Sequence, residues 1–192
     1  MSDSFVRSWD DSLVVKNYDL GVSSDILFER MVIWTDLAQS MEIGYETYGA
    51  YIDHVTFKDI NVLYNFHKAV ISIHNGDQAD ITNIIFENIL VEEANMIGDN
   101  VLSDDDNFLI DIGIVYNELW STSFERGNIS NITIKNVEVL QGIPNLKINI
   151  SGYDDDHMIK NVSLENIVVQ GESFSFENMR LYITNYINEL YH

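Results

Sequence analysis

Two adjacent aspartates near the start of the chain, Asp10 and Asp11, are the residues whose type and spacing point most directly to chemistry. They stand immediately before a short apolar stretch at residues 13–16, so they must face solvent, hydrogen-bond donors or a bound molecule. Like charges this close raise the pKa of one carboxyl. A carboxyl with a raised pKa can donate a proton at neutral pH while its partner accepts one, which is paired acid–base chemistry.

A nine-residue pattern that recurs along the chain predicts the scaffold for this pair. Apolar and polar residues alternate at 52–60, 81–89, 129–137 and 159–167, and this period of two indicates strands with one buried face. Equivalent aliphatic positions are separated by 29, 29, 48 and 30 residues, as in a solenoid whose third step carries an insertion. These positions are Ile26, Val55, Ile84, Ile132 and Val162.

A second set of short alternating segments lies between the copies of this pattern, at residues 13–16, 41–44, 70–74, 109–113 and 146–150. We therefore predict an all-β fold, a single-stranded right-handed parallel β-helix of six to seven coils, with one domain over residues 1–192. An inserted loop region at about 95–128 is expected to form a lid, a wall or an oligomer contact. Residues 171–192 are expected to cap the C-terminal end with a last strand, and a short helix after it is an open alternative.

Asparagine recurs at fixed places in the repeat, and this favours a structural role over a functional one. Asn tolerates the left-handed backbone conformation of a tight corner, and its amide can bond to the next coil. We predict stacked asparagines at the corners: Asn83, Asn88, Asn131, Asn136, Asn161 and Asn166.

The segment around the aspartates, Ser-Trp-Asp-Asp-Ser-Leu-Val-Val-Lys at residues 8–16, resembles the active-site signature of polygalacturonase-type glycoside hydrolases, namely family 28 and the related family 49 dextranases. Residues 34–44 occupy the place of the Gly-His-Gly segment of family 28 but lack its histidine, and they are more similar to family 49. Residues 67–74 fall where family 28 has an Arg-Ile-Lys strand, which this chain does not reproduce.

The resemblance implies hydrolysis of a glycosidic bond with inversion, with Asp10 as general acid and Asp11 as base. A further aspartate that both families carry about one coil upstream has no counterpart, so we expect the chain to lack the N-terminal coils of such an enzyme. An uncapped N-terminal end would favour self-association. A non-catalytic carbohydrate-binding or adhesive β-helix, and an inactive fragment of a hydrolase, are the alternative functions.

The net charge of the chain argues against several classes of binding partner. Ten Lys and Arg stand against 31 Asp and Glu, for a formal net charge of −21, which disfavours nucleic acid, anionic membranes and the polyanion pectin. A neutral poly- or oligosaccharide is the expected substrate, without a cofactor or a metal. Calcium at 104–106 or 154–156 is an alternative. We expect an extracellular or periplasmic protein, although no signal pattern is visible in this chain.

The strand register and the aromatic content suggest further substrate-binding residues. Glu42, Ser72, Asp111 and Asn149 are expected to share one outward column, with Lys16, Gly44 and His74 two positions further on. Glu42 is either a third carboxylate beside the pair or an ordinary exposed acid, and for His67 and His74 a partly buried surface histidine is favoured over a role in catalysis. The candidates for substrate binding are Trp9, Lys16, Trp34, Glu42, Tyr45, His67, Lys68, Ser72, His74 and Asp111.

Overall fold

The computed structural model describes residues 1–96, 108–143, 146–175, 180–183 and 186–191, and the regular elements within these ranges are all strands. Within them, no helix is long and apolar enough to cross a membrane. The strands are β1 (Ser2–Ser8), β2 (Leu13–Asn17), β3 (Val22–Thr35), β4 (Met41–Thr47), β5 (Tyr51–Asn65), β6 (Ile71–Asn75), β7 (Asp80–Ala94), β8 (Phe108–Ile114), β9 (Ile129–Gly142), β10 (Lys147–Ser151), β11 (Ile159–Val169), β12 (Glu172–Ser173), β13 (Arg180–Ile183) and β14 (Ile187–Tyr191).

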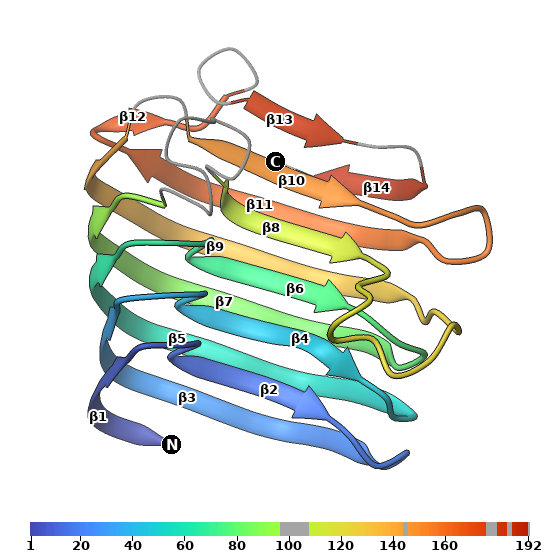
Figure 1. Ribbon diagram of the computed structural model, residues 1–192. Coiled ribbons are helices and arrows are strands. Elements are labelled where there is room, and N and C mark those ends of the chain that lie inside the picture. The colour runs from blue at the N-terminus through green and yellow to red at the C-terminus, as the bar shows by residue number, and fades with distance from the viewer. Residues whose placement is uncertain (97–107, 144–145, 176–179, 184–185, 192) are drawn as a thin grey trace.

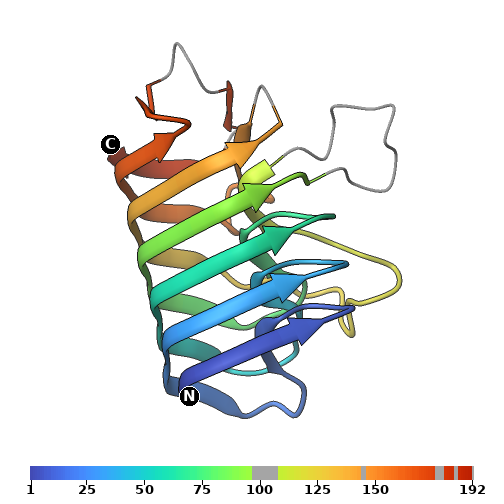
Figure 2. The same ribbon diagram turned by 90° about the vertical axis from the view of Figure 1, so that its left-hand side faces the viewer.

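The strands form two facing sheets that run the length of the molecule (Figures 1 and 2). Sheet A has the order β1-β3-β5-β7-β9-β11-β12, with β14 also paired to β11, and sheet B has the order β13-β10-β8-β6-β4-β2. Each coil pairs in parallel with the next, and among the described strands only β12 pairs in an antiparallel sense. The chain is therefore a right-handed parallel β-solenoid of about six turns, which confirms the predicted fold.

The asparagine corners of sheet A are confirmed. The six asparagines have positive φ angles between 51° and 58°, the left-handed conformation that lets a long strand turn. Their side-chain amides form hydrogen bonds from one coil to the next along two rows. Asn166 donates to Asn136 at 2.9 Å, Asn136 to Asn88 at 2.9 Å, and Asn88 to Asp59 at 2.7 Å. These residues stabilise the scaffold and lie apart from the cleft described below.

The core between the sheets consists of the inward residues of each coil. Phe28, Phe57 and Phe86 come from successive coils and stack with ring centroids 5.0 and 4.8 Å apart. Isoleucine and valine fill most other inward positions. Since each coil buries its apolar face against its neighbours, the spacing of about 29 residues is a direct consequence of the solenoid.

The irregular parts of the prediction have mixed outcomes. The predicted insertion contains β8 and a segment without regular strands at residues 115–128, visible as the yellow loop in Figure 1. The alternative of a helix at 181–190 is wrong for the described residues, which form β13 and β14. The suggested calcium ligands at 104–106 lie outside the described residues.

Candidate active site

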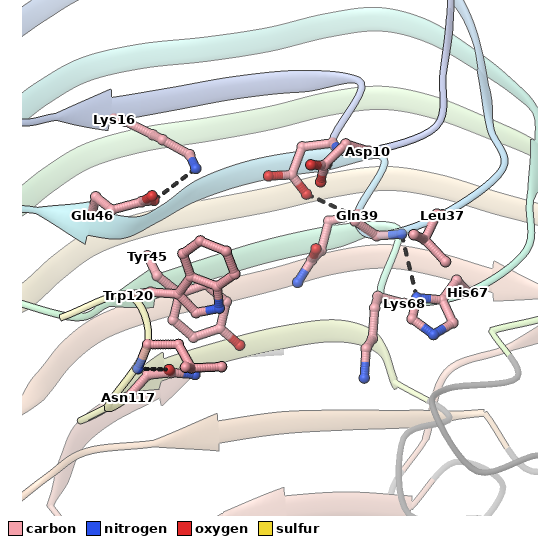
Figure 3. A pocket seen from close by; sticks show the side chains of 13 residues that line it. Asp10, Lys16, Leu37, Gln39, Tyr45, Glu46, His67, Lys68, Asn117 and Trp120 are labelled. Atoms are coloured by element: carbon pink, nitrogen blue, oxygen red, sulfur yellow. Dashed lines mark hydrogen bonds and ion pairs between the residues drawn. The ribbon is translucent and has the colours of Figure 1, made fainter.

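An open cleft of about 490 Å³ lies over the outer face of sheet B (Figure 3). Its lining comes from the turn before β2, from β2 and β4, from the turns before β4 and β6, and from residues 115–128. Sequence-distant segments meet here because the solenoid stacks equivalent parts of successive coils. The lining residues are Asp10, Asp11, Lys16, Leu37, Ala38, Gln39, Tyr45, Glu46, His67, Lys68, Asn117, Leu119 and Trp120.

The two aspartates occupy different environments within this cleft. Asp10 is exposed, and its Oδ1 accepts the backbone N–H of Asp11 at 2.9 Å. Asp11 is partly buried, and its Oδ1 accepts the backbone N–H of Gln39 at 3.1 Å. Burial, followed by the negative charge of Glu42, raises the pKa of Asp11 from 3.8 to about 6. Asp11 is thus a carboxyl that can hold a proton close to neutral pH.

A buried polar network lies behind the cleft on sheet B. His74 Nδ1 is 2.9 Å from Glu42 Oε1, and its Nε2 is 3.2 Å from Asp111 Oδ2. Ser72 donates to the Glu42 carboxylate, and Asn149 donates to Asp111 at 2.8 Å. Burial alone would lower the pKa of His74, but the two carboxylates outweigh it and raise that pKa well above its ordinary value. The ring is therefore an imidazolium between two carboxylates.

Tyr45 separates this network from the open cleft. Its ring stacks on the His74 imidazole with centroids 4.3 Å apart and planes 2° apart. The preceding Gly44 has a φ of +120°, and a Cβ there would lie 2.0 Å from the His74 carbonyl oxygen. Glycine is therefore required where β4 passes β6, because only a residue without a side chain permits this approach.

Lys16 and Glu46 form an ion pair at the β2–β4 side of the cleft. Lys16 Nζ lies 2.6 Å from Glu46 Oε2, and the Tyr18 hydroxyl donates to Glu46 Oε1 at 2.7 Å. Burial would raise the pKa of Glu46, but the contacts with Lys16 and Tyr18 lower it overall. The positive charge of Lys16 is consequently matched by a neighbouring carboxylate of the cleft.

The structure brings six of the residues singled out from the sequence to the cleft surface, namely Asp10, Asp11, Lys16, Tyr45, His67 and Lys68. The predicted column of Glu42, Ser72, Asp111 and Asn149 is confirmed by strand register. However, Glu42 and His74 are only 1% and 4% exposed, so the alternatives of an exposed acid and a surface histidine are wrong for them. The residues singled out that do not line the cleft are Trp9, Trp34, Glu42, Ser72, His74 and Asp111.

Two aromatic residues proposed for substrate binding do not line the cleft. Trp9 precedes Asp10 in the chain, yet its side chain is 72% exposed and does not line the cleft. Trp34 is on sheet A, where its Nε1 donates to Asp36 at 2.9 Å and its ring packs on Tyr64.

Several cleft residues had no signal in the sequence pattern. Leu37, Ala38 and Gln39 lie in the turn before β4, whereas Asn117, Leu119 and Trp120 lie in the insertion. The turn residues lie within the segment 34–44 that the resemblance had indicated, whereas for the insertion the only indication was the failure of the repeat after residue 95. Among the described residues, no three His, Cys, Asp or Glu side chains are grouped so as to hold a metal ion.

Comparison with family models, curated proteins and solved structures found no match to this chain. The resemblance to polygalacturonase-type enzymes therefore rests on the residues themselves. The parallel solenoid agrees with it at the level of fold.

Proposed function

We propose that this protein is a glycoside hydrolase that cleaves a neutral poly- or oligosaccharide with inversion at the anomeric carbon. The observation that carries the proposal is Asp11, a carboxyl with a pKa of about 6 that lines an open cleft beside a second carboxylate. Glycosidic bond hydrolysis needs such a pair, one protonated and one ionised. The sequence of residues 8–16 supports the same reaction independently through its resemblance.

In this mechanism Asp11 gives its proton to the glycosidic oxygen while the bond from that oxygen to the anomeric carbon breaks. The Asp10 carboxylate takes a proton from a water molecule whose oxygen bonds to the anomeric carbon from the opposite face. The net change is the addition of one water molecule, and proton exchange with solvent restores both groups.

These roles reverse those that the resemblance implies, in which Asp10 is the acid. The reversal follows from the environment, since burial and Glu42 raise the pKa of Asp11, while Asp10 is open to solvent. A substrate with an activated leaving group distinguishes the two assignments, because it does not need protonation. Activity towards a glycosyl fluoride should survive in Asp11→Asn and be lost in Asp10→Asn, and the opposite result would restore the implied roles.

The cleft chemistry favours an uncharged sugar. Lys16 is paired with Glu46, and the carboxylates of Asp10 and Asp11 would repel a uronate. An Arg-x-Lys strand for a carboxylate-bearing sugar is absent from residues 67–74. We therefore expect release of reducing ends from neutral polysaccharides in preference to polygalacturonate.

The decisive experiment measures reducing-end release from a panel of neutral polysaccharides by the wild type, Asp10→Asn, Asp11→Asn and the double variant. Asp59→Asn is the matched control, since Asp59 is a corner residue of sheet A outside the cleft. Proton NMR of the first product should show inverted anomeric configuration. Hydrolysis that persisted in the double variant would refute the assignment.

A non-catalytic carbohydrate-binding function is the second candidate, favoured by the aromatic side chains of Tyr45 and Trp120 in the cleft. A wild type that bound the polysaccharides and released no reducing ends would replace hydrolysis with this function.

A further inference from the structure

The segment 115–128, here called the wall segment, is anchored to the solenoid by two buried charged residues. Asp77 is fully buried, and its Oδ1 accepts the backbone N–H groups of Thr122 and Ser123, both at 2.7 Å. Its Oδ2 accepts the N–H of Thr47 on β4 at 3.2 Å. A carboxylate this deep is stable only with such donors, so Asp77 ties the wall segment directly to β4.

Arg126 holds the other side of the same segment. Its guanidinium donates to the carbonyl oxygens of Gly76 and Ser123, and to that of Val115 at 3.0 Å. It also lies over the Tyr116 ring, 5.4 Å from the centroid. The base of the wall segment is therefore fixed, and a side chain carried at its tip has a defined position over sheet B.

The tip of the wall segment presents apolar side chains to solvent. Leu119, Trp120 and Phe124 are 82%, 51% and 85% exposed. Exposed apolar surface is unfavourable by about 25 cal/mol per Å², so its concentration on an anchored segment indicates a surface that something covers. Leu119 and Trp120 line the cleft, and Phe124 does not.

Trp120 occupies the part of the cleft across from the carboxylates. Figure 3 shows its indole with the Tyr45 ring on one side of the cleft, while Asp10, Gln39 and Lys68 extend from other elements. The Gln39 side-chain amide has no hydrogen-bond partner within the described residues, although its backbone N–H bonds to Asp11. The cleft thus combines an aromatic face with an amide that can bind hydroxyl groups.

A neutral pyranose ring matches this combination. Its C–H groups form an apolar face suited to an indole, and its hydroxyl rim needs hydrogen-bond partners. An anionic ligand matches less well, since three acidic residues (Asp10, Asp11 and Glu46) stand against two lysines (Lys16 and Lys68) in the lining, and the chain carries a net charge of −21.

We propose that Trp120 is a sugar-stacking residue, and that the wall segment holds its indole against a neutral sugar unit bound beside Asp10 and Asp11. This inference rests on the proposed function in that the ligand is the polysaccharide substrate. It adds a binding residue from the insertion, which the repeat pattern does not specify. The substrate chain then lies between the wall segment and the Asp10–Asp11 turn.

The test measures binding in the Asp11→Asn background, so that hydrolysis does not consume the ligand. Affinity gel electrophoresis with each neutral polysaccharide of the panel gives a dissociation constant for Trp120→Ala, Trp120→Phe and the control Phe124→Ala. We expect Trp120→Ala to weaken binding about ten-fold or more, the usual scale for truncating an aromatic anchor. Trp120→Phe should retain part of the affinity, and Phe124→Ala should bind like its parent.

Equal binding by Trp120→Ala and its parent would overturn the inference, as would an equal loss in Phe124→Ala or a parent that bound no member of the panel. Thermal unfolding should be unchanged in Trp120→Ala, because Asp77 and Arg126 remain to anchor the segment. The two proposals fail separately. Weakened binding in Trp120→Ala with no hydrolysis by the wild type would support stacking and refute the hydrolase, whereas hydrolysis with unchanged binding would do the reverse.

Discussion

Sheet A and sheet B are built from the same coils but use their outward side chains in opposite ways. On sheet A, the same residue type recurs from coil to coil, as in the row Asn88, Asn136 and Asn166, and these amides are exposed. On sheet B, one column holds Glu42, Ser72, Asp111 and Asn149, all different. Repetition therefore marks structural positions in this solenoid, and its absence marks the polar network that lies behind the cleft.

The two sheets also differ in how deeply their polar side chains are buried. The sheet A corners keep their polar groups in solvent, where a hydrogen bond between side-chain amides of adjacent coils contributes about 1 kcal/mol to stability. The sheet B network places an imidazolium between two carboxylates, and the Tyr45 ring of the cleft stacks on that imidazolium. Such charges tolerate the loss of a partner poorly, and the predictions below use that contrast.

The largest effect is expected from Asp111→Ala, which leaves the buried His74 imidazolium with one carboxylate. Losing a hydrogen bond to this buried cation costs about 1.5–3 kcal/mol of unfolding free energy, compared with about 1 kcal/mol for Asn136→Gly on sheet A, which loses an exposed amide without left-handed strain. Urea denaturation at pH 7 measures both variants. Similar losses in the two variants would contradict the contrast between the sheets.

The pH dependence of this effect has a definite sign. Burial would raise the pKa of Asp111, but His74 outweighs it and lowers that pKa below 3.8. The contribution of ionised Asp111 to the free energy of unfolding is therefore complete above its ordinary pKa. It is lost as the pH falls through the lowered value. His74 behaves oppositely, since its raised pKa makes its contribution complete below about 6.5 and lost as the pH rises through the raised value.

The second prediction concerns the coupling between the buried network and the cleft. Glu42→Gln removes the charge that, after burial, raises the pKa of Asp11, so this pKa should fall from about 6 towards its ordinary value. Carboxyl carbon chemical shifts in labelled protein measure it without any substrate. The alkaline limb of hydrolysis, where Asp11 loses its proton, should move to lower pH by the same amount.

An Asp11 pKa that stayed near 6 in Glu42→Gln would show that burial alone sets it. Asp59→Asn on sheet A is the control, and it should leave the Asp11 titration unchanged. Because the Glu42 substitution also removes a contact to His74, the titration is compared only in samples that show the wild-type far-ultraviolet circular dichroism.

The third prediction tests the corner conformation of sheet A. Asn136 has a φ of 55°, which glycine adopts freely and alanine does not. Both Asn136→Gly and Asn136→Ala lose the same side-chain amide. Asn136→Ala should therefore be less stable than Asn136→Gly by about 1 kcal/mol, the scale of left-handed strain. Equal stability of the two variants in urea denaturation would mean that asparagine occurs at these corners because of its side-chain hydrogen bonds, and not because of the left-handed backbone conformation.

The smallest effect is expected from Asp59→Asn. Asp59 accepts the Asn88 amide at 2.7 Å, and an asparagine oxygen can accept the same bond. Stability should change by less than about 0.5 kcal/mol, with hydrolysis unaffected. The same exchange at Asp11 should reduce hydrolysis by about 10²–10⁴-fold, the usual contribution of a general acid or base. Comparable losses at both positions would remove the functional distinction between the sheets.

The sequence predicted the scaffold well and the site in part. Period-two alternation and a spacing of about 29 residues are local signals, so strands, coils and the Glu42–Ser72–Asp111–Asn149 column followed from them. The raised pKa within the Asp10–Asp11 pair was also expected, but its main causes are burial and Glu42, and the repulsion by Asp10 on which the expectation rested is a lesser one. Trp9 was misplaced and Trp120 missed, since side-chain direction in turns and insertions does not follow the repeat.

The amino-acid sequence by itself determined the solenoid, its corners and the adjacent acid pair, because each depends on residues close together or at a fixed period. Only the tertiary structure decided which acid has the raised pKa, that Glu42 and His74 are buried, and that Trp120 faces the cleft. These properties depend on segments from different coils and on the anchored insertion. Burial and charge at one position are set by neighbours that the chain brings together only on folding.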